Sequence, residues 1–178
     1  VYDEQNSYLR CEKLILPTLL SSPKYHFHPI LNAALDRVPK IDQGYPLIYV
    51  TREKPSTYRT FLNAPEIADI ARSEGFLCIS PETLHLQAQV GLFANARVVA
   101  DDFGSALHNA IFSPSVTKVL ALNWINYCQS RIAQLRQQTI GYIVDERGVA
   151  AHRDATKVEY RIDPERFRKY AAILANSV

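Results

Sequence analysis

Continuous apolar runs alternate with amphipathic stretches along most of this chain. Runs of this kind, rich in Val, Ile and Leu, are typical of strands buried on both faces of a parallel sheet. The predicted strands cover residues 47–51, 76–79, 98–100, 118–122 and 139–144. The stretches between them, about ten to fifteen residues long, suit crossover helices and predict right-handed parallel connections. The pattern therefore predicts an α/β fold, a Rossmann-like three-layer domain with a mostly parallel sheet.

Helix signals stand between these runs. Asn63-Ala-Pro-Glu66 predicts a helix start with Asn63 as the cap and Glu66 reaching back, and Gly75 predicts its end. Ser80-Pro81-Glu82 predicts the next start by the same logic. Asp163-Pro164 begins a last helix, on which one face is expected to carry Phe167, Tyr170, Ala171 and Leu174.

The N-terminal region has a mixed pattern, in which residues 14–16 predict a short strand and 29–38 a short helix. We expect residues 1–40 to be a linker or part of an N-terminal region, and residues 41–178 to form the domain. His26 and His28 would lie on one face of an extended segment. Because no third ligand lies nearby, an exposed loop that faces an acceptor or another domain is favoured over a metal site.

The composition is ordinary for a globular protein, with 47% apolar and 21% charged residues. A formal net charge of +2 provides no basic field that would argue for nucleic-acid binding. Arginines gather at Arg161, Arg166 and Arg168, but acidic residues interleave with them. A solvated helix face of mixed charge is therefore expected there.

The three cysteines, Cys11, Cys78 and Cys128, are far apart and lack the paired spacing of a zinc site, which indicates thiols in a reducing compartment. No run approaches the roughly 18 apolar residues of a membrane-spanning helix, and no signal-peptide pattern opens the chain. We therefore expect a cytoplasmic protein, with the inner face of the membrane as an option. The chain begins at Val1 and contains no methionine, so we expect a fragment of a longer gene product.

Residues 97–114 combine a short strand, a tight turn and the start of a helix. The first turn of a helix has N–H groups without partners, and its dipole favours negative charge. The small residues Gly104, Ser105 and Ala106 at the bend would let a phosphate approach these groups. The alternative interpretation is that these residues only turn the chain.

Other side chains around this turn have competing interpretations. Asp101 and Asp102 would repel a diphosphate, so we expect them to point away, with Asp102 capping the helix; alternatively one accepts a hydrogen bond from a ribose hydroxyl. His108 either reaches a cleft or is a core or surface residue. Asn109 bonds phosphate, sugar or backbone. Trp124, after a later strand, either flanks a base or belongs to the core.

Arginines offer the positive charge that a phosphate site needs. The strand at 47–51 places Arg52 at its carboxyl end, which is where open α/β sheets bind ligands. Arg52 and Arg59 are the predicted phosphate partners, because guanidinium groups match phosphate oxygens and stay charged. The alternative is an ion pair of either arginine with Glu53 or Glu66.

Several of these residues follow one another in an order that resembles the glycosyltransferase 61 family over about residues 8–145. The segments that carry the resemblance are Tyr-Val-Thr-Arg at 49–52, Arg59, Asn63 to Glu66, Gly75-Phe76, Gln89 with Phe93 and Ala96, and Gly104 to Asn109. No single segment is specific, and the weight lies in the ordered set. The family's usual loop reads Gly-x-His-Gly-Ala-Gly-Leu-Thr-Asn, whereas this chain has Asp101 for an early glycine and Phe103 for the histidine. In the family's Asn-Glu pair, Asn63 is present but Ala64 follows it.

The resemblance implies the C-terminal half of a two-domain GT-B enzyme, often described in bacteria as a capsular polysaccharide biosynthesis protein. Such an enzyme transfers a hexosyl or pentosyl group from a nucleotide-sugar donor to a glycan acceptor, with inversion and without metal or cofactor. The donor would be held by Arg52, Arg59, Gly104, Ser105, Ala106, Leu107, His108 and Asn109. Gln89 and Asp102 would support this loop, and the general base would come from the missing N-terminal domain.

Two other classes of function stay open from the sequence. One is a non-catalytic α/β module that binds a nucleotide or a protein. The other is a metal-dependent phosphate hydrolase with Asp101 or Asp102 as nucleophile. The chain has neither a P-loop lysine motif nor a full Gly-x-Gly-x-x-Gly fingerprint, which argues against an ATPase or a typical dehydrogenase.

Overall fold

The computed structural model describes residues 2–3, 8–9, 13, 27–38, 44–52, 59–102, 104–125, 127–145 and 158–178. Near the N-terminus, β1 (Tyr2–Asp3) and β2 (Tyr8–Leu9) form an antiparallel pair. The strand predicted at 14–16 lies outside the described residues, as do Cys11 and His26. In the described part of the chain, no helix has the length and apolar character needed to cross a membrane.

The central sheet has five strands, and all neighbouring pairs are parallel. Its order is β5-β3-β6-β7-β8. The strands are β3 (Leu47–Val50), β5 (Leu77–Ile79), β6 (Val98–Asp102), β7 (Lys118–Leu122) and β8 (Thr139–Ile143). They match the five predicted runs within two residues at each end, so the predicted Rossmann-like α/β fold is confirmed.

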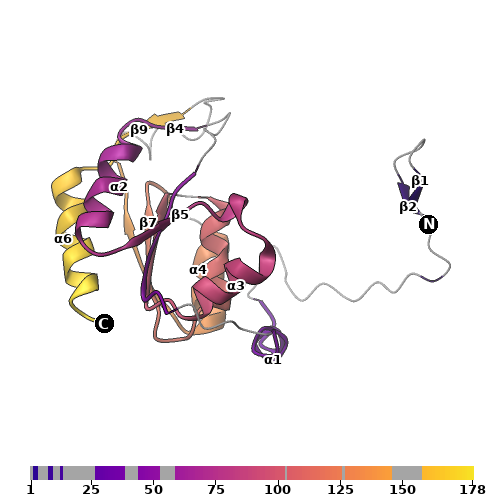
Figure 1. The fold of residues 1–178 in the computed structure, drawn as a ribbon. Helices are drawn as coiled ribbons and strands as arrows, with labels where there is room; N and C mark the ends of the chain where they lie inside the picture. The colour runs from indigo at the N-terminus through magenta and orange to yellow at the C-terminus, as the bar shows by residue number, and fades with distance from the viewer. Residues whose placement is uncertain are drawn as a thin grey trace.

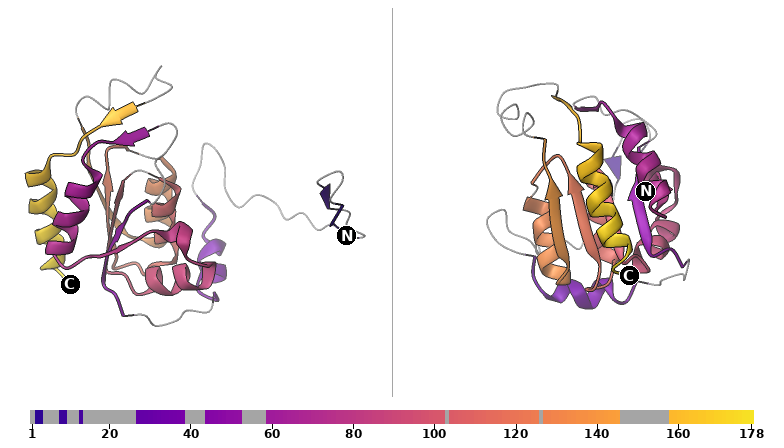
Figure 2. Two further views of the ribbon diagram at one scale, coloured as in Figure 1. Left: turned by 45° about the horizontal axis from the view of Figure 1, so that its top comes forward. Right: turned by 90° about the vertical axis from the view of Figure 1, so that its left-hand side faces the viewer.

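Helices cover both faces of the sheet, which gives three layers (Figures 1 and 2). On one face lie α2 (Ala64–Ser73) and α6 (Pro164–Ala175), and on the other α3 (Leu86–Ala94), the 3₁₀ helix η2 (Ser105–Phe112) and α4 (Tyr127–Arg136). Strand residues alternate between the two cores, because successive side chains point to opposite faces. Tyr49 packs with α2 and α6, whereas Ile48 and Val50 pack with the other layer.

Two helix predictions need correction. The helix predicted to begin at Ser80 is only a 3₁₀ turn, η1 (Pro81–Thr83), and α3 starts at Leu86. The Ser80 hydroxyl does not cap it, because that hydroxyl lies 2.9 Å from the Thr51 hydroxyl. His85 is the cap instead, with its Nδ1 accepting from the Ala88 N–H at 3.1 Å. On α6, Tyr170 lies at the margin of the predicted apolar face and is 39% exposed.

A second parallel pair, which the apolar pattern did not predict, joins β4 (Arg59–Phe61) to β9 (Val158–Tyr160). Asn63 extends this connection, since its Nδ2 donates to the Ile162 carbonyl at 2.8 Å and its Oδ1 accepts from the Ile162 N–H at 3.1 Å. Asn63 stands at the N-cap position of α2, but its side chain makes no capping bond. The predicted capping box is therefore wrong, because the carboxamide is bonded to Ile162 and to the Glu66 carboxylate.

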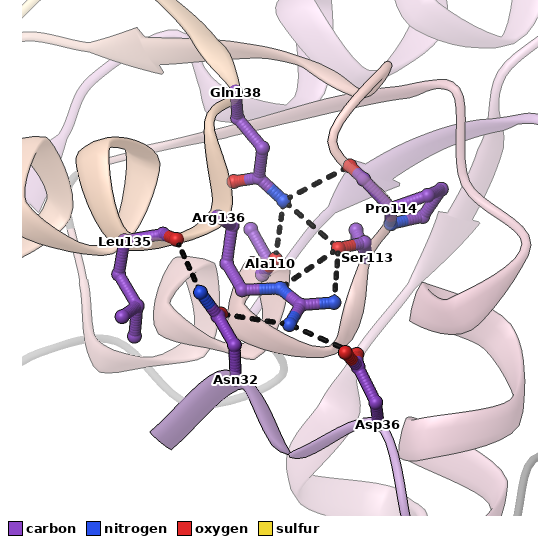
Figure 3. A network of polar contacts seen from close by, with 8 residues as sticks. All are labelled: Asn32, Asp36, Ala110, Ser113, Pro114, Leu135, Arg136 and Gln138. Carbon is purple, nitrogen blue, oxygen red and sulfur yellow. Dashed lines mark hydrogen bonds and ion pairs between the residues drawn. The ribbon is translucent and has the colours of Figure 1, made fainter. Parts of the chain in front are cut away.

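The short helix α1 (Ile30–Leu35) is attached to this domain through Arg136 (Figure 3). The Arg136 side chain is 8% exposed, and its Nη1 lies 3.0 Å from both Asn32 Oδ1 and Asp36 Oδ1. Its Nε and Nη2 donate to the Ser113 carbonyl at 3.4 Å. One buried guanidinium thus joins α1 to the end of α4 and to the segment after η2.

Candidate functional site

The strand order reverses at one point of the sheet, which is where open α/β sheets have their binding crevice. The chain leaves β3 toward β5 on one side and later enters β6 on the other side, so the order reverses between β3 and β6. Ligands of open α/β sheets bind at such a point, outside the carboxyl ends of the strands. Arg52 follows β3 by two residues, Asp102 ends β6, and Gly104 begins the next loop. The structure therefore brings Arg52, Asp102 and Gly104 together at the switch point.

The Arg52 guanidinium lies directly against the backbone of Gly104. A Cβ built on Gly104 would overlap Arg52 Nη2 and would lie 2.8 Å from Arg52 Cζ. Gly104 is extended, with φ −170 and ψ 170, so the backbone conformation does not require glycine there. Glycine is needed at position 104 because any larger side chain would occupy the space of the Arg52 guanidinium.

Asp102 is a charged partner of this arginine. Its Oδ2 lies 3.6 Å from Arg52 Nε, and the two side chains are 15% and 27% exposed. The prediction that Asp102 caps the following helix is wrong, because Asp102 is still part of β6 and Gly104 occupies the N-cap position of η2. The Asp102 carboxylate forms an ion pair with Arg52 and makes no capping bond to η2.

The start of η2 offers backbone rather than side-chain contacts. Leu107 is 1% exposed, and its N–H donates to the Gly104 carbonyl at 3.2 Å. The Leu107 amide predicted to bind phosphate is therefore engaged within the helix. The amides of Ser105 and Ala106 precede this first intrahelical bond, and Ser105 is exposed. They are the N–H groups of the predicted set that remain nearest the crevice.

Gln89 connects three segments, as the prediction that it bonds a neighbouring loop requires. Its Nε2 donates to the carbonyls of Pro81 and Leu84 at 2.9 and 2.8 Å. Its Oε1 accepts from Asn109 Nδ2 at 2.9 Å. Asn109 is thus bonded to a side chain of α3, and the pair fixes η2 on that helix.

His108 supplies no positive charge to the crevice. Its Nε2 is closed off from solvent and has no hydrogen-bond partner among the residues that the structure describes. Burial lowers the pKa of this imidazole below the ordinary value of 6.5, so the ring is neutral at neutral pH. The predicted contact of His108 with a donor stays a prediction.

Negative charge is concentrated at the end of β6. Asp101 is fully buried. Tyr49, on the neighbouring strand β3, interacts electrostatically with both Asp101 and Asp102. Burial raises the pKa of the Tyr49 hydroxyl well above its ordinary value of 10.0, and the carboxylates of Asp101 and Asp102 raise it further. Arg52 therefore lies where a cation is needed even before a ligand arrives.

Two buried carboxamides near this edge were missed by the sequence reasoning. Asn123 directly follows β7, is 2% exposed and has a left-handed φ of 73. Gln129, in the first turn of α4, is 1% exposed. Within the described part of the chain, neither carboxamide has a hydrogen-bond partner, so each needs one from water or a ligand. The available signal was an asparagine immediately after an apolar strand, because asparagine tolerates the left-handed region.

A separate hollow of about 430 Å³ opens between the end of β8 and the start of α6. The residues that line it are Ile143, Val144, Asp145, Arg161, Ile162, Asp163 and Arg166. None of the predicted donor-site residues is among them. The sequence reasoning assigned this arginine cluster to a solvated helix face, but Arg161 precedes α6 and faces a cavity with Arg166.

The remaining predicted residues are placed less completely. Arg59 is a residue of β4 opposite Val158, in the second sheet, and its phosphate contact stays a prediction. Trp124 is half-buried at the end of β7. In the ranges that the structure describes, no three His, Cys, Asp or Glu side chains gather in a way that could hold a metal ion.

Comparison with known protein families supports this placement of the site. A family model described as Glycosyltransferase 61 matches residues 4–120, a range that contains β3 to β6, the first part of β7 and both sides of the switch-point crevice. This range also holds every segment on which the resemblance in the sequence rests. A search of the curated proteins found no match.

Proposed function

This chain belongs to the glycosyltransferase 61 family, and from that premise we propose that it is the donor-binding half of a GT-B enzyme. Membership implies the transfer of a sugar from a donor to an acceptor. The finer proposal is that the donor is a nucleotide sugar, that the acceptor is a glycan, and that a hexosyl or pentosyl group is transferred with inversion. Assembly of a bacterial capsular polysaccharide is the role that fits such a reaction.

The observation that carries the proposal is the position of Arg52 against the Gly104 backbone at the switch point. As the sugar leaves its nucleoside diphosphate, negative charge builds on the departing phosphate. Fixed positive charge and N–H groups at that place stabilise the transition state. The Arg52 guanidinium and the amides of Ser105 and Ala106 supply both, and Asp102 keeps the arginine in place.

This arrangement needs no metal ion, because a guanidinium and a helix start take the part that a divalent cation plays elsewhere. The acceptor hydroxyl must also lose a proton, and we propose that the base lies on a second domain across the cleft. Cys78 is a free cysteine, which suits a reducing compartment. We therefore propose action in the cytoplasm, including the inner face of the membrane.

The structure gives less support to a phosphate hydrolase with an aspartate nucleophile. Asp101 is fully buried, so its carboxylate cannot meet a phosphorus atom in a ligand. The Asp102 carboxylate lies 3.6 Å from the Arg52 guanidinium, so this ion pair already occupies it. A non-catalytic nucleotide-binding module would share the Arg52 crevice and would differ only in transferring no sugar.

Calorimetric titration of this chain with a panel of nucleoside diphosphates tests the proposal. One nucleotide should bind without metal, and Arg52→Ala should weaken it by about 10- to 150-fold, the loss of one charge-assisted hydrogen-bonding group. Arg97→Ala is the matched control, since Arg97 is exposed at the opposite edge of the sheet, just before β6. Equal affinity in Arg52→Ala would refute the site, and binding that requires magnesium would favour the hydrolase.

A further inference from the structure

The hollow beside α6 has the size of a small-molecule site. Its volume of about 430 Å³ falls in the range of about 300–1,000 Å³ that such sites occupy. It opens at the carboxyl end of β8, which is three strands away from β3, the strand that Arg52 follows. At a strand spacing of about 4.8 Å, the ends of β3 and β8 lie about 14 Å apart, at the same edge of the sheet.

The carboxylates in its wall are already engaged with backbone. Asp145 Oδ2 accepts from the Arg161 N–H at 3.0 Å. Asp163 Oδ1 caps α6 by accepting from the N–H groups of Glu165 and Arg166 at 2.9 and 3.1 Å. Both acids therefore accept hydrogen bonds from backbone N–H groups.

The two guanidinium groups are much less engaged. Arg161 is 53% exposed, and its Nη1 lies 3.8 Å from the Glu66 carboxylate, which is itself 50% exposed. An ion pair of that length and exposure is weak. Arg166 is exposed in the first turn of α6 and has no ion pair within the described residues. The hollow thus presents two available cations next to a positive helix end.

The other residues of the wall are Ile143, Val144 and Ile162. Ile143 and Ile162 are only 2% and 1% exposed, so they offer a ligand little apolar surface. The two arginines are therefore the main recognition groups, and a guanidinium fork pairs equally well with a carboxylate and with a phosphate. The geometry points to an anionic group as the ligand, and a glycan acceptor would carry that group on an acidic sugar.

We propose that this hollow binds an acidic sugar residue of the acceptor glycan, with Arg161 and Arg166 pairing to its carboxylate or phosphate group. The inference goes beyond the proposed function, on which it rests for the glycan acceptor. The donor diphosphate occupies the Arg52 crevice, and the acidic residue binds at β8, three strands away from β3. The enzyme therefore prefers acceptors that carry negative charge.

Titration followed by NMR tests this with glucuronic acid, glucose 6-phosphate and neutral glucose as probes. At least one acidic sugar should bind the parent chain, and glucose should not. Arg161→Gln and Arg166→Gln should each weaken the acidic sugar by about tenfold. The matched control is Arg168→Gln on the same helix, because Arg168 lies 3.7 Å from Glu74 and does not line the hollow. The probe that binds identifies the anionic group.

Several outcomes would overturn the inference. They are equal binding of glucose, no binding of either acidic sugar, and an equal loss in Arg168→Gln. A nucleoside diphosphate that binds less well to Arg166→Gln would place the donor phosphate in this hollow and would also overturn it. If the acidic sugar binds as expected but no nucleotide does, the inference stands and the proposed donor site fails.

Discussion

Replacing Gly104 by alanine tests the site without touching any charged group. The alanine Cβ would overlap Arg52 Nη2 and approach Cζ to 2.8 Å, so the guanidinium must leave its place. The backbone conformation at Gly104 accepts alanine without strain, because φ −170 and ψ 170 are extended values that any residue adopts. The added methyl group of Gly104→Ala should therefore displace the Arg52 side chain and leave the backbone unchanged.

The structure separates the effect on binding from the effect on folding. Moving the guanidinium should lose a charge-assisted contact to the diphosphate, worth about 1.5–3 kcal/mol or about 10- to 150-fold in Kd. Stability should fall by less than about 1 kcal/mol, because the ion pair lost is partly exposed and its atoms are 3.6 Å apart. The variant should thus fold like the parent and bind nucleotide far less tightly.

The assay is a double-mutant cycle in calorimetry with Arg52→Ala. If Gly104 acts through Arg52, then Gly104→Ala should have no further effect in the Arg52→Ala background. Gly141→Ala provides the matched control, since the nearest atom to its added Cβ is Leu120 Cδ1 at 3.9 Å. Additive losses from the two site variants, or unchanged nucleotide binding in Gly104→Ala, would refute the reasoning.

Two further predictions concern stability. Asn63→Ala should lower the unfolding free energy by about 2–4 kcal/mol in urea, because it leaves the buried N–H and carbonyl of Ile162 unpaired; a loss below about 0.5 kcal/mol would contradict this. The lowered pKa of His108 means that the unfolded chain binds its proton first, so stability should fall as pH drops through 6.5 toward the native pKa. His108→Gln should flatten that part of the profile of Tm against pH, and an identical slope in both proteins would assign the acid sensitivity to other groups.

The apolar runs predicted the sheet because each strand is buried on both faces and its neighbours are reached by short crossovers. The run at 118–122, for example, becomes β7 with its exact predicted bounds. The position of Arg52 followed from the same pattern, since a residue after a parallel strand must lie at the carboxyl edge. These features depend on local sequence, and local sequence was sufficient for them.

Features that depend on distant partners were not accessible in this way. Asn63 was expected to cap its own helix, but its carboxamide bonds Ile162, 99 residues further along the chain. Asp102 was expected at a cap, but the strand continues through it and Arg52 supplies its partner. Arg161 and Arg166 line one hollow together with residues at the end of β8. The sequence around the two arginines contains no signal for this distant neighbour.

The contact between α1 and Arg136 bears on how this protein can be shortened. A fragment that begins at residue 41 would keep all five strands of the central sheet. It would also leave a guanidinium that is only 8% exposed without Asn32 and Asp36. The Ser113 carbonyl would be its remaining partner of this network, and water would have to replace the other two. A cloning boundary placed between α1 and β3 would therefore expose a guanidinium that the whole chain keeps largely buried.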